Sequence, residues 1–157
     1  MIEKEKVKEL LKTEEERFNR EHPISRKLFE RAKNSLYSGV PMNWMVRWAS
    51  PYPVFVARAK GAHFTDVDGK DYLDLCLGDT GAMTGHAPEQ AVEEICSRIK
   101  NGTTFMLPTE DSLWVGEELK RRFGLPYWQV ALTATDATRF SIRLARHITK
   151  RPNVLVF

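Results

Sequence analysis

The chain has 157 residues, of which 42% are hydrophobic, so it is long enough to bury a single core of ordinary size. Its 24 basic and 21 acidic side chains leave a formal charge of only +3, which excludes the strongly basic footprint of a nucleic-acid-binding protein. Its two cysteines form no CxxC pair, and no apolar run reaches the ~18 residues that would span a bilayer. We therefore expect a reduced, cytoplasmic protein with no nucleic-acid partner and no membrane association.

Two helices are predicted at the start of the chain. In residues 1–21, apolar side chains recur close to helical spacing among many charged ones, which is typical of an amphipathic helix. Pro23 ends this helix, because the residue before a proline is pushed out of the helical region. Ser25 is a candidate N-cap for a second helix that runs to about Leu36.

A period-two pattern begins at residue 53 and predicts short strands. The runs PVFVARA, GAHFTDVD and KDYLDLCL alternate apolar and polar residues. The Asp68-Gly69 pair between the last two runs is a strong hairpin signal, because both residues tolerate positive φ. We predict a small antiparallel meander, which leads through the glycine-rich segment GDTGAMTGH to residue 87.

Aspartate and histidine side chains are the candidate metal ligands of this sequence. Four aspartates alternate around the hairpin turn, and they are Asp66, Asp68, Asp71 and Asp74. A calcium site is one interpretation of them, but their alternation favours a solvated face of the hairpin. The four histidines are His22, His63, His86 and His147. They show no metal-ligand spacing such as HExxH, so we predict no metal site.

Two helices of ordinary length are predicted next. Pro88 suits the start of the first, since a helix loses little when its first residue lacks an N–H, and Asn101-Gly102 ends it. Thr109 is a good N-cap for the second helix, and Gly124 ends that helix.

The remaining sequence predicts a strand, a helix and a strand. The apolar runs YWQVAL and NVLVF flank an amphipathic helix that ends near Thr149, as in a βαβ unit with parallel strands. Since a parallel sheet needs more than two strands, we expect an incomplete sheet. The predicted fold class is α/β, in three regions: N-terminal helices and an irregular segment (1–52), the meander and glycine-rich loop (53–87), and the truncated start of a large α/β domain (88–157).

The turn before the last helix is a candidate phosphate site. Thr133, Ala134 and Thr135 would bring hydroxyls and free backbone N–H groups to a helix N-terminus, where a phosphate is held well. The alternative is a capping box that needs no ligand, with Thr133 as N-cap and Asp136 three residues later. Neither GxGxxG nor GxxxxGK[ST] occurs, so the sequence lacks the main signal of a dinucleotide or P-loop site.

Arg47 is a candidate for binding a substrate carboxylate. It lies in an irregular segment among Trp44, Met45, Val46 and Trp48. A guanidinium with apolar and aromatic neighbours is suited to bidentate capture of a carboxylate, because desolvation strengthens the pair. A guanidinium stacked on a tryptophan face, or a plain surface arginine, is the alternative.

Four longer stretches occur in an order shared with a known family. They are RKLFERAKNSLYSGV, GAHFTDVDGKDYLDLCLGDTGAMTGHAPEQAVEEI, NGTTFMLPTED and TATDATRFSIRLARHITKR. Together they resemble class III aminotransferases, close to the branch that includes glutamate-1-semialdehyde aminomutase. The resemblance covers about residues 25–157 and implies a fold-type-I enzyme with a large α/β domain that binds pyridoxal 5'-phosphate.

The resemblance also assigns site residues. In that family the turn usually reads Ser-Gly-Thr-Glu-Ala and binds the cofactor phosphate, which implies cofactor binding by Thr133, Ala134 and Thr135. The sequence departs from this pattern with Ala134 in place of glycine and Asp136 in place of glutamate. The segment GDTGAMTGH and these two departures resemble the sequences of a family branch that is active on β-amino acids.

The family's Schiff-base lysine, its ring-stacking aromatic residue and its acidic partner of the ring nitrogen have no counterpart in this sequence. The available lysines include Lys70, Lys100, Lys120 and Lys150, and none stands in the family's lysine context. No catalytic residue is therefore assigned. We expect these 157 residues to be an N-terminal portion that is inactive alone.

The resemblance implies transfer of an amino group between an amino acid or amine and an oxo acid, by an enzyme that is a homodimer when complete. Three alternatives stay open. They are an aminomutase-type isomerase, a truncated non-catalytic interaction module, and an independent phosphate- or nucleotide-binding α/β domain.

Overall fold

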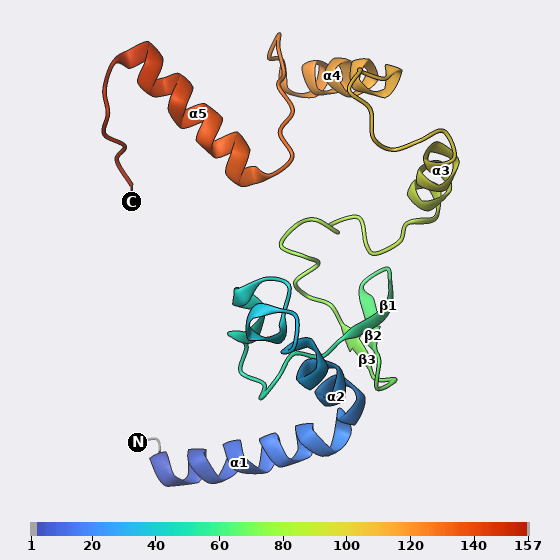
Figure 1. Cartoon of the computed structure of the whole chain (residues 1–157), viewed down its shortest axis with the longest axis vertical. Helices are drawn as coiled ribbons and strands as arrows, with labels where there is room; N and C mark the ends of the chain where they lie inside the picture. The colour runs from blue at the N-terminus through green and yellow to red at the C-terminus, as the bar shows by residue number, and fades with distance from the viewer. Residues whose placement is uncertain (1–2, 157) are drawn as a thin grey trace. The chain divides into compact units, whose positions relative to one another are not determined.

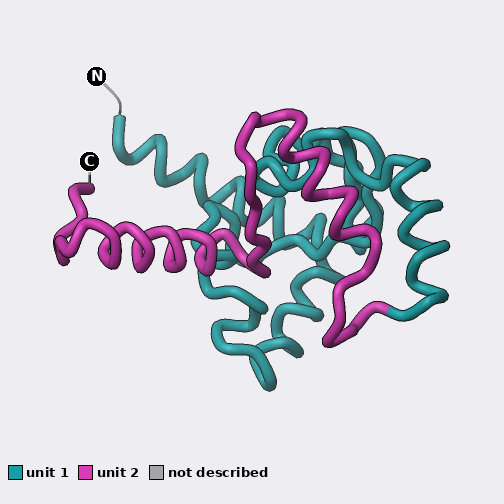
Figure 2. The backbone as a smooth tube through the Cα atoms, turned by 90° about the horizontal axis from the view of Figure 1, so that it is seen from above, with its two compact units in different colours: residues 1–102 teal, residues 103–157 magenta. Residues whose placement is uncertain are grey.

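A computed structural model describes residues 3–156 of the chain (Figure 1). The chain divides into two compact units, residues 1–102 and residues 103–157, which Figure 2 draws in two colours. Unit 1 contains helices and one small sheet, and unit 2 contains two helices and irregular segments. No helix among residues 3–156 is both long enough and apolar enough to cross a bilayer.

The two N-terminal helices are confirmed, but the second begins earlier than predicted. Helix α1 spans Lys4–Glu21 and helix α2 spans Pro23–Ala32. Pro23 begins α2 as well as ending α1, because a proline at the first helical position costs no hydrogen bond. The prediction that Ser25 caps α2 is wrong. His22 is the N-cap residue, and Ser25 lies in the first turn with its side chain fully buried.

The antiparallel meander is confirmed as a three-stranded sheet in the order β1-β2-β3. Its strands are β1 (Val56–Lys60), β2 (His63–Asp66) and β3 (Asp71–Leu73). The β2–β3 connection is a hairpin turn in which the N–H of Gly69 donates to the carbonyl of Asp66 at 3.1 Å. Gly69 takes positive φ, at 84°, whereas Asp68 does not. The turn therefore needs its glycine at one position only.

The prediction that the hairpin aspartates form a solvated face is wrong for Asp66, at the end of β2. The Asp66 side chain is 1% exposed, because the turn itself satisfies one carboxylate oxygen. Asp66 Oδ1 accepts the backbone N–H groups of Asp68 and Lys70 at 2.9 and 2.8 Å, and Oδ2 accepts the hydroxyl of Tyr72 at 2.9 Å. A buried carboxylate with this many donors no longer depends on water.

The buried part of unit 1 lies between α1, α2 and the segment that leads into the sheet. Two short 3₁₀ helices, η1 (Tyr37–Gly39) and η2 (Asn43–Val46), follow α2. Among residues 3–156, Val40 and Tyr52 are the buried hydrophobic side chains, at 4% and 6% exposure. The ring of Tyr52 lies 5.0 Å from that of Phe18 and 6.2 Å from that of Phe29.

Replacing Gly39 tests how tightly the side chains of this small core pack around it. Gly39 has φ of +72°, and a Cβ there would lie 2.8 Å from Cε2 of Phe29. In the complete enzyme, Gly39→Ala should lower the free energy of unfolding by about 2–4 kcal/mol, from backbone strain and overpacking together. Gly69→Ala is the matched control, since Gly69 has φ of +84° but open space at its Cβ, and should cost about 1–2 kcal/mol. If urea unfolding gave the same loss of free energy for both variants, the Phe29 ring would move aside at no measurable cost.

Three further helices are confirmed close to their predicted positions. Helix α3 spans Glu89–Ile99, helix α4 spans Glu110–Phe123 and helix α5 spans Ala134–Thr149. Gly124 ends α4 in the left-handed conformation, with φ of 70°.

The two strands predicted around α5 are not formed. Neither residues 127–132 nor residues 153–156 pair with another strand, and Phe157 lies outside the described residues. Each run is apolar enough for a buried strand, but strand formation needs a neighbour to which its N–H and C=O groups can bond. The described residues of unit 2 offer none, so the predicted βαβ unit is present only as its helix.

Unit 2 leaves its apolar surfaces uncovered. None of its residues up to Val156 is buried. On α5, the side chains of Phe140, Leu144 and Ile148 lie on one face and are 50%, 61% and 69% exposed. Amphipathic helices normally cover such a face with a sheet or another helix.

Candidate functional site

The predicted capping interaction at the start of α5 is formed. Thr133 has extended backbone dihedrals, with φ of −137° and ψ of 156°. Its hydroxyl accepts the backbone N–H of Asp136 at 3.0 Å and donates to the Asp136 carboxylate at 2.9 Å. The hydroxyl of Thr133 is thus already engaged in fixing the turn.

The capping interaction leaves other donors of the turn free. Within residues 3–156, the backbone N–H groups of Ala134 and Thr135 make no hydrogen bond, and neither does the hydroxyl of Thr135. All three candidate residues are exposed. Free N–H groups at the positive end of a 16-residue helix, beside a free hydroxyl, suit an anion such as a phosphate group.

One negative charge lies close to this turn and is paired. Asp136 stands in the first turn of α5, where its carboxylate would repel a phosphate. The guanidinium of Arg139 lies 3.3 Å from that carboxylate. Since Arg139 offsets the charge of Asp136, the turn can still favour an anion.

Arg47 lies in unit 1, directly after η2. It is exposed, and its backbone has left the helical conformation, with φ of −91° and ψ of 3°. The rings of Trp44 and Trp48 pack edge to face with centroids 6.2 Å apart. Among residues 3–156 the guanidinium has no hydrogen bond, ion pair or stacked ring. The alternative in which Arg47 stacks on a tryptophan is therefore not formed.

Asp74 and His86, which the sequence does not pair, close the glycine-rich loop. Asp74 Oδ2 lies 2.6 Å from His86 Nε2, while Oδ1 accepts the N–H groups of Cys76 and Leu77 at 2.9 Å each. The hydrogen bond with His86, followed by that from Leu77, lowers the pKa of the Asp74 carboxyl. Backbone bonds between Gly61 and His86 join the neck of the loop to the sheet.

The loop closed by Asp74 and His86 holds its backbone in uncommon conformations. Leu77, Asp79 and Thr80 have φ of 49°, 51° and 85°. Such angles are uncommon for residues other than glycine and occur often in segments that shape a binding site. No cluster of three or more His, Cys, Asp or Glu side chains placed to hold a metal occurs in the described part of the chain.

Comparison with known proteins decides the family. The sequence model of the class-III aminotransferases matches residues 44–157, a range that includes both Arg47 and the turn before α5. The chain belongs to the class-III aminotransferase family. The match starts after α1 and α2.

Similarity to individual class-III proteins extends over nearly the whole chain. Glutamate-1-semialdehyde 2,1-aminomutase from Methanosphaera stadtmanae is 40% identical over 136 residues, which are 85% of this chain and 31% of that protein. A crystal structure of a glutamate-1-semialdehyde aminomutase from Pseudomonas aeruginosa PAO1 is 47% identical, with a TM-score of 0.89 over 96% of this chain and 33% of that chain. A variant of that enzyme was solved in complex with PMP.

A structure described as a transaminase with PLP bound is 31% identical, with a TM-score of 0.79 over 84% of this chain and 31% of that chain. The chain thus spans about a third of the length of the class-III relatives it matches. Because the Pseudomonas structure is 47% identical and aligns over 96% of this chain, the chain shares its fold with about a third of that class-III structure.

Proposed function

We propose that the chain is part of an enzyme that uses pyridoxal 5'-phosphate to transfer an amino group between an amino acid or amine and an oxo acid. The observation that carries the proposal is the set of free donors at Ala134 and Thr135, at the N-terminus of a helix within the family match. When bound, the cofactor supplies the electron sink for the amino transfer. The turn Thr133–Thr135 would hold its phosphate.

The residues of the turn have different roles in this proposal. The backbone N–H groups of Ala134 and Thr135 would donate to phosphate oxygens, and the Thr135 hydroxyl would add a third donor. Thr133 would act through the backbone it shapes, because its hydroxyl is bonded to Asp136. Ala134 is exposed, so its Cβ is accommodated without displacing a neighbour in unit 2.

Two reactions are candidates for the complete enzyme. Intermolecular transamination is favoured by the departures Ala134 and Asp136, and by the similarity to a PLP-bound transaminase. A 2,1-aminomutase reaction on glutamate-1-semialdehyde is favoured by the relatives that are 40% and 47% identical. In the complete enzyme, amino transfer to pyruvate or 2-oxoglutarate would support the first. Migration of the amino group within glutamate-1-semialdehyde, with no external acceptor, would support the second.

The partners in this proposal are a small-molecule amino donor and an oxo-acid acceptor. The complete enzyme would be a homodimer, as the resemblance in the sequence implies, and cytoplasmic, as its cysteine content predicts. Size-exclusion chromatography with light scattering on the complete enzyme would test the dimer directly.

Replacing Thr135 tests the phosphate assignment. Thr135→Val keeps the shape of the side chain but removes the hydroxyl donor, and a hydrogen bond to a charged group contributes about 1.5–3 kcal/mol. The dissociation constant for pyridoxal phosphate, measured by titrating the apo form of the complete enzyme, should therefore rise roughly 10- to 150-fold. Thr138→Val, one turn along the same helix, is the control and should change the constant less than about twofold. An unchanged affinity in Thr135→Val would remove Thr135 from the site.

A further inference from the structure

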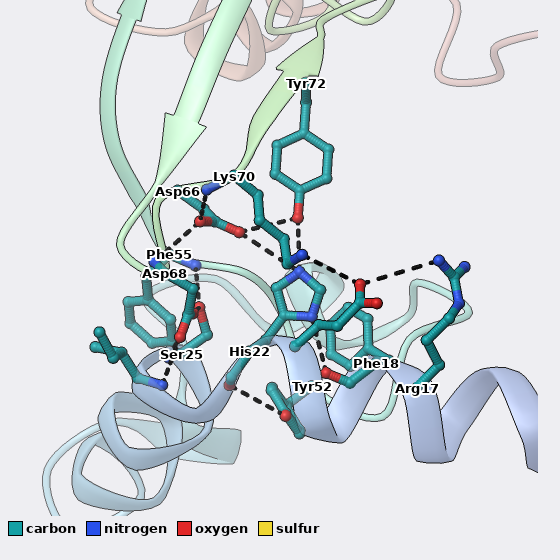
Figure 3. A network of polar contacts seen from close by, with 12 residues as sticks. Arg17, Phe18, His22, Ser25, Tyr52, Phe55, Asp66, Asp68, Lys70 and Tyr72 are labelled. Atoms are coloured by element: carbon teal, nitrogen blue, oxygen red, sulfur yellow. Dashed lines mark hydrogen bonds and ion pairs between the residues drawn. The ribbon is translucent and has the colours of Figure 1, made fainter.

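Three side chains from distant parts of unit 1 meet in a buried polar group, here named the His22 cluster: His22, Asp66 and Tyr72 (Figure 3). His22 joins α1 to α2 and is 5% exposed, while Asp66 ends β2. The ring of Phe18 stacks on the imidazole at 4.1 Å. The proposed amino transfer does not use this cluster.

The His22 cluster needs one proton more than a neutral histidine, an ionised aspartate and a phenol supply together. The imidazole Nδ1 lies 2.8 Å from the carbonyl oxygen of Phe18, and Nε2 lies 2.7 Å from the hydroxyl of Tyr72. That hydroxyl lies 2.9 Å from Asp66 Oδ2. Each contact requires one hydrogen. Because a carbonyl only accepts, Nδ1 must carry a proton, and a neutral imidazole then has none on Nε2.

The single hydroxyl hydrogen of Tyr72 can serve only one of the two remaining contacts. A neutral histidine and an ionised aspartate therefore leave one contact of the cluster without a hydrogen. One extra proton, on either His22 or Asp66, satisfies all three contacts.

The surroundings of Asp66 place the extra proton on His22. Asp66 Oδ1 accepts two backbone N–H groups, which favours the ionised carboxylate. Burial, and then the hydrogen bond to Asp66, raise the pKa of Tyr72, so the phenol keeps its hydrogen and donates it to Asp66. Nε2 of an imidazolium can then donate to the Tyr72 oxygen, and Nε2 itself lies 3.5 Å from Asp66 Oδ2.

Other charged groups around His22 favour the same state. The pKa of the Glu21 carboxyl is lowered, chiefly by its hydrogen bond with Lys70 and to a smaller degree by His22. For Asp68, desolvation opposes ionisation, but hydrogen bonds from Ser25 and Ile24, with a contribution from His22, lower the pKa overall. His22 thus faces carboxylates from α1 and from the hairpin.

The nearby cations and the other phenol do not offset these carboxylates. Lys70 and Arg17 lie 3.2 and 3.9 Å from Glu21 and are directed toward it. Arg26 of α2 acts on Tyr52, whose hydroxyl donates to the backbone carbonyl of His22 at 3.2 Å. The charges of Asp66 and Asp68 are therefore left for an imidazolium to balance.

We propose that the His22 cluster is a proton-dependent latch: His22, held as an imidazolium and bridged through Tyr72 to the carboxylate of Asp66, fastens the α1–α2 junction to the β2–β3 hairpin. A second set of hydrogen bonds joins the same two parts, because Asp68 of the hairpin accepts the N–H groups of Ile24 and Ser25 at 2.6 and 2.9 Å. Loss of the extra proton would leave one of the buried contacts without its hydrogen and weaken the bridge from His22 through Tyr72 to Asp66.

The sign of the pH dependence follows from the proton count. A histidine in an unfolded or detached segment loses its proton at about pH 6.5. Below that pH both states carry the proton, and the latch contributes its full stabilisation. Above it, opening releases one proton, so the opening equilibrium constant should rise by up to about tenfold per pH unit until the closed cluster has also lost its proton.

Hydrogen–deuterium exchange of residues 18–26, measured by mass spectrometry in the complete enzyme between pH 6 and pH 9, tests the latch. After division by the intrinsic exchange rates, protection of this segment should fall by up to about tenfold per pH unit above pH 6.5. In His22→Gln, which can bond but cannot titrate, protection should not depend on pH. His63→Gln is the matched control, since His63 is an exposed histidine on β2, and should behave as the wild type.

A second measurement does not depend on how well a variant folds. In wild-type enzyme labelled with ¹⁵N-histidine, the imidazole nitrogens of His22 should both be protonated at pH 7.5. A neutral His22 beside an ionised Asp66, or protection that is flat with pH in the wild type, would overturn the proposal. Doubly protonated nitrogens together with pH-dependent protection would support it, whether or not the enzyme transfers amino groups.

Discussion

Residues 1–157 expressed alone are expected to transfer no amino groups at a rate above that of free pyridoxal phosphate. Catalysis in the class-III family depends on a lysine that bonds covalently to the cofactor, and no lysine of this sequence stands in that context. Lys70 lies 3.2 Å from Glu21 and joins α1 to the hairpin, and Lys150 is the left-handed C-cap of α5. The turn at Thr133–Thr135 could hold the cofactor only by its phosphate.

The same 157 residues should also fail to unfold as a cooperative, soluble monomer. Residues 127–132 and 153–156 form no strand, and the apolar face of α5 is uncovered within unit 2. Exposed apolar faces and unpaired strand-forming segments promote association between chains. On α3 of unit 1, the side chains of Val92, Ile95 and Ile99 are likewise 42–58% exposed.

The measurement has two parts, each with its own contrary outcome. Amino transfer from a panel of amino acids to pyruvate, 2-oxoglutarate or a semialdehyde acceptor is compared with that of free cofactor, and turnover above this background would contradict the catalytic half. A thermal transition is recorded beside sedimentation of the same sample. A single cooperative transition in a soluble monomer would contradict the stability half, and the complete enzyme is the positive control for both.

Features with a local cause were predictable from the sequence. Pro23 fixes the α1–α2 boundary, Gly69 makes the hairpin turn, Gly124 ends α4 and Thr133 caps α5. In each case one residue type has the backbone or side-chain geometry that its position requires. The helix N-terminus at Thr133 was recognisable for the same reason, and phosphate binding there stays a prediction.

Features that depend on distant residues were not predictable. Ser25 has the composition of an N-cap, but its hydroxyl donates to Asp68, 43 residues away, at 2.6 Å. The burial of Asp66 depends on Tyr72, and through it on His22, which lies 50 residues from Tyr72. Asp74 and His86 are 12 residues apart, and no sequence motif predicts that they pair.

The strand predictions failed for a related reason. An apolar run shows that a segment is suited to burial in a sheet, but whether it forms a strand depends on the partner beside it. For YWQVAL the described chain offers no partner, while the shorter and more polar β2 is formed because β1 and β3 bond to both of its edges.

Arg47→Ala in the complete enzyme should raise the Michaelis constant for amino acids roughly 10- to 150-fold and leave that for simple amines nearly unchanged. The range corresponds to the loss of a charged hydrogen-bond partner, about 1.5–3 kcal/mol. The exposed guanidinium has no partner among residues 3–156, so it is available for a carboxylate. Arg47 lies in the sequence between Trp44 and Trp48, whose rings pack together, and apolar neighbours would strengthen such a pair.

Two further variants separate carboxylate capture from a general effect of charge. Arg47→Lys keeps the charge but loses the planar pair of donors, so it should recover only part of the affinity for amino acids. Arg58→Ala removes another exposed arginine of unit 1, on β1, and should leave both substrate classes unaffected. If Arg47→Ala changed the constants for amino acids and amines equally, Arg47 would not bind the substrate carboxylate. A selective loss for amino acids, absent in Arg58→Ala, would place the substrate carboxylate at Arg47.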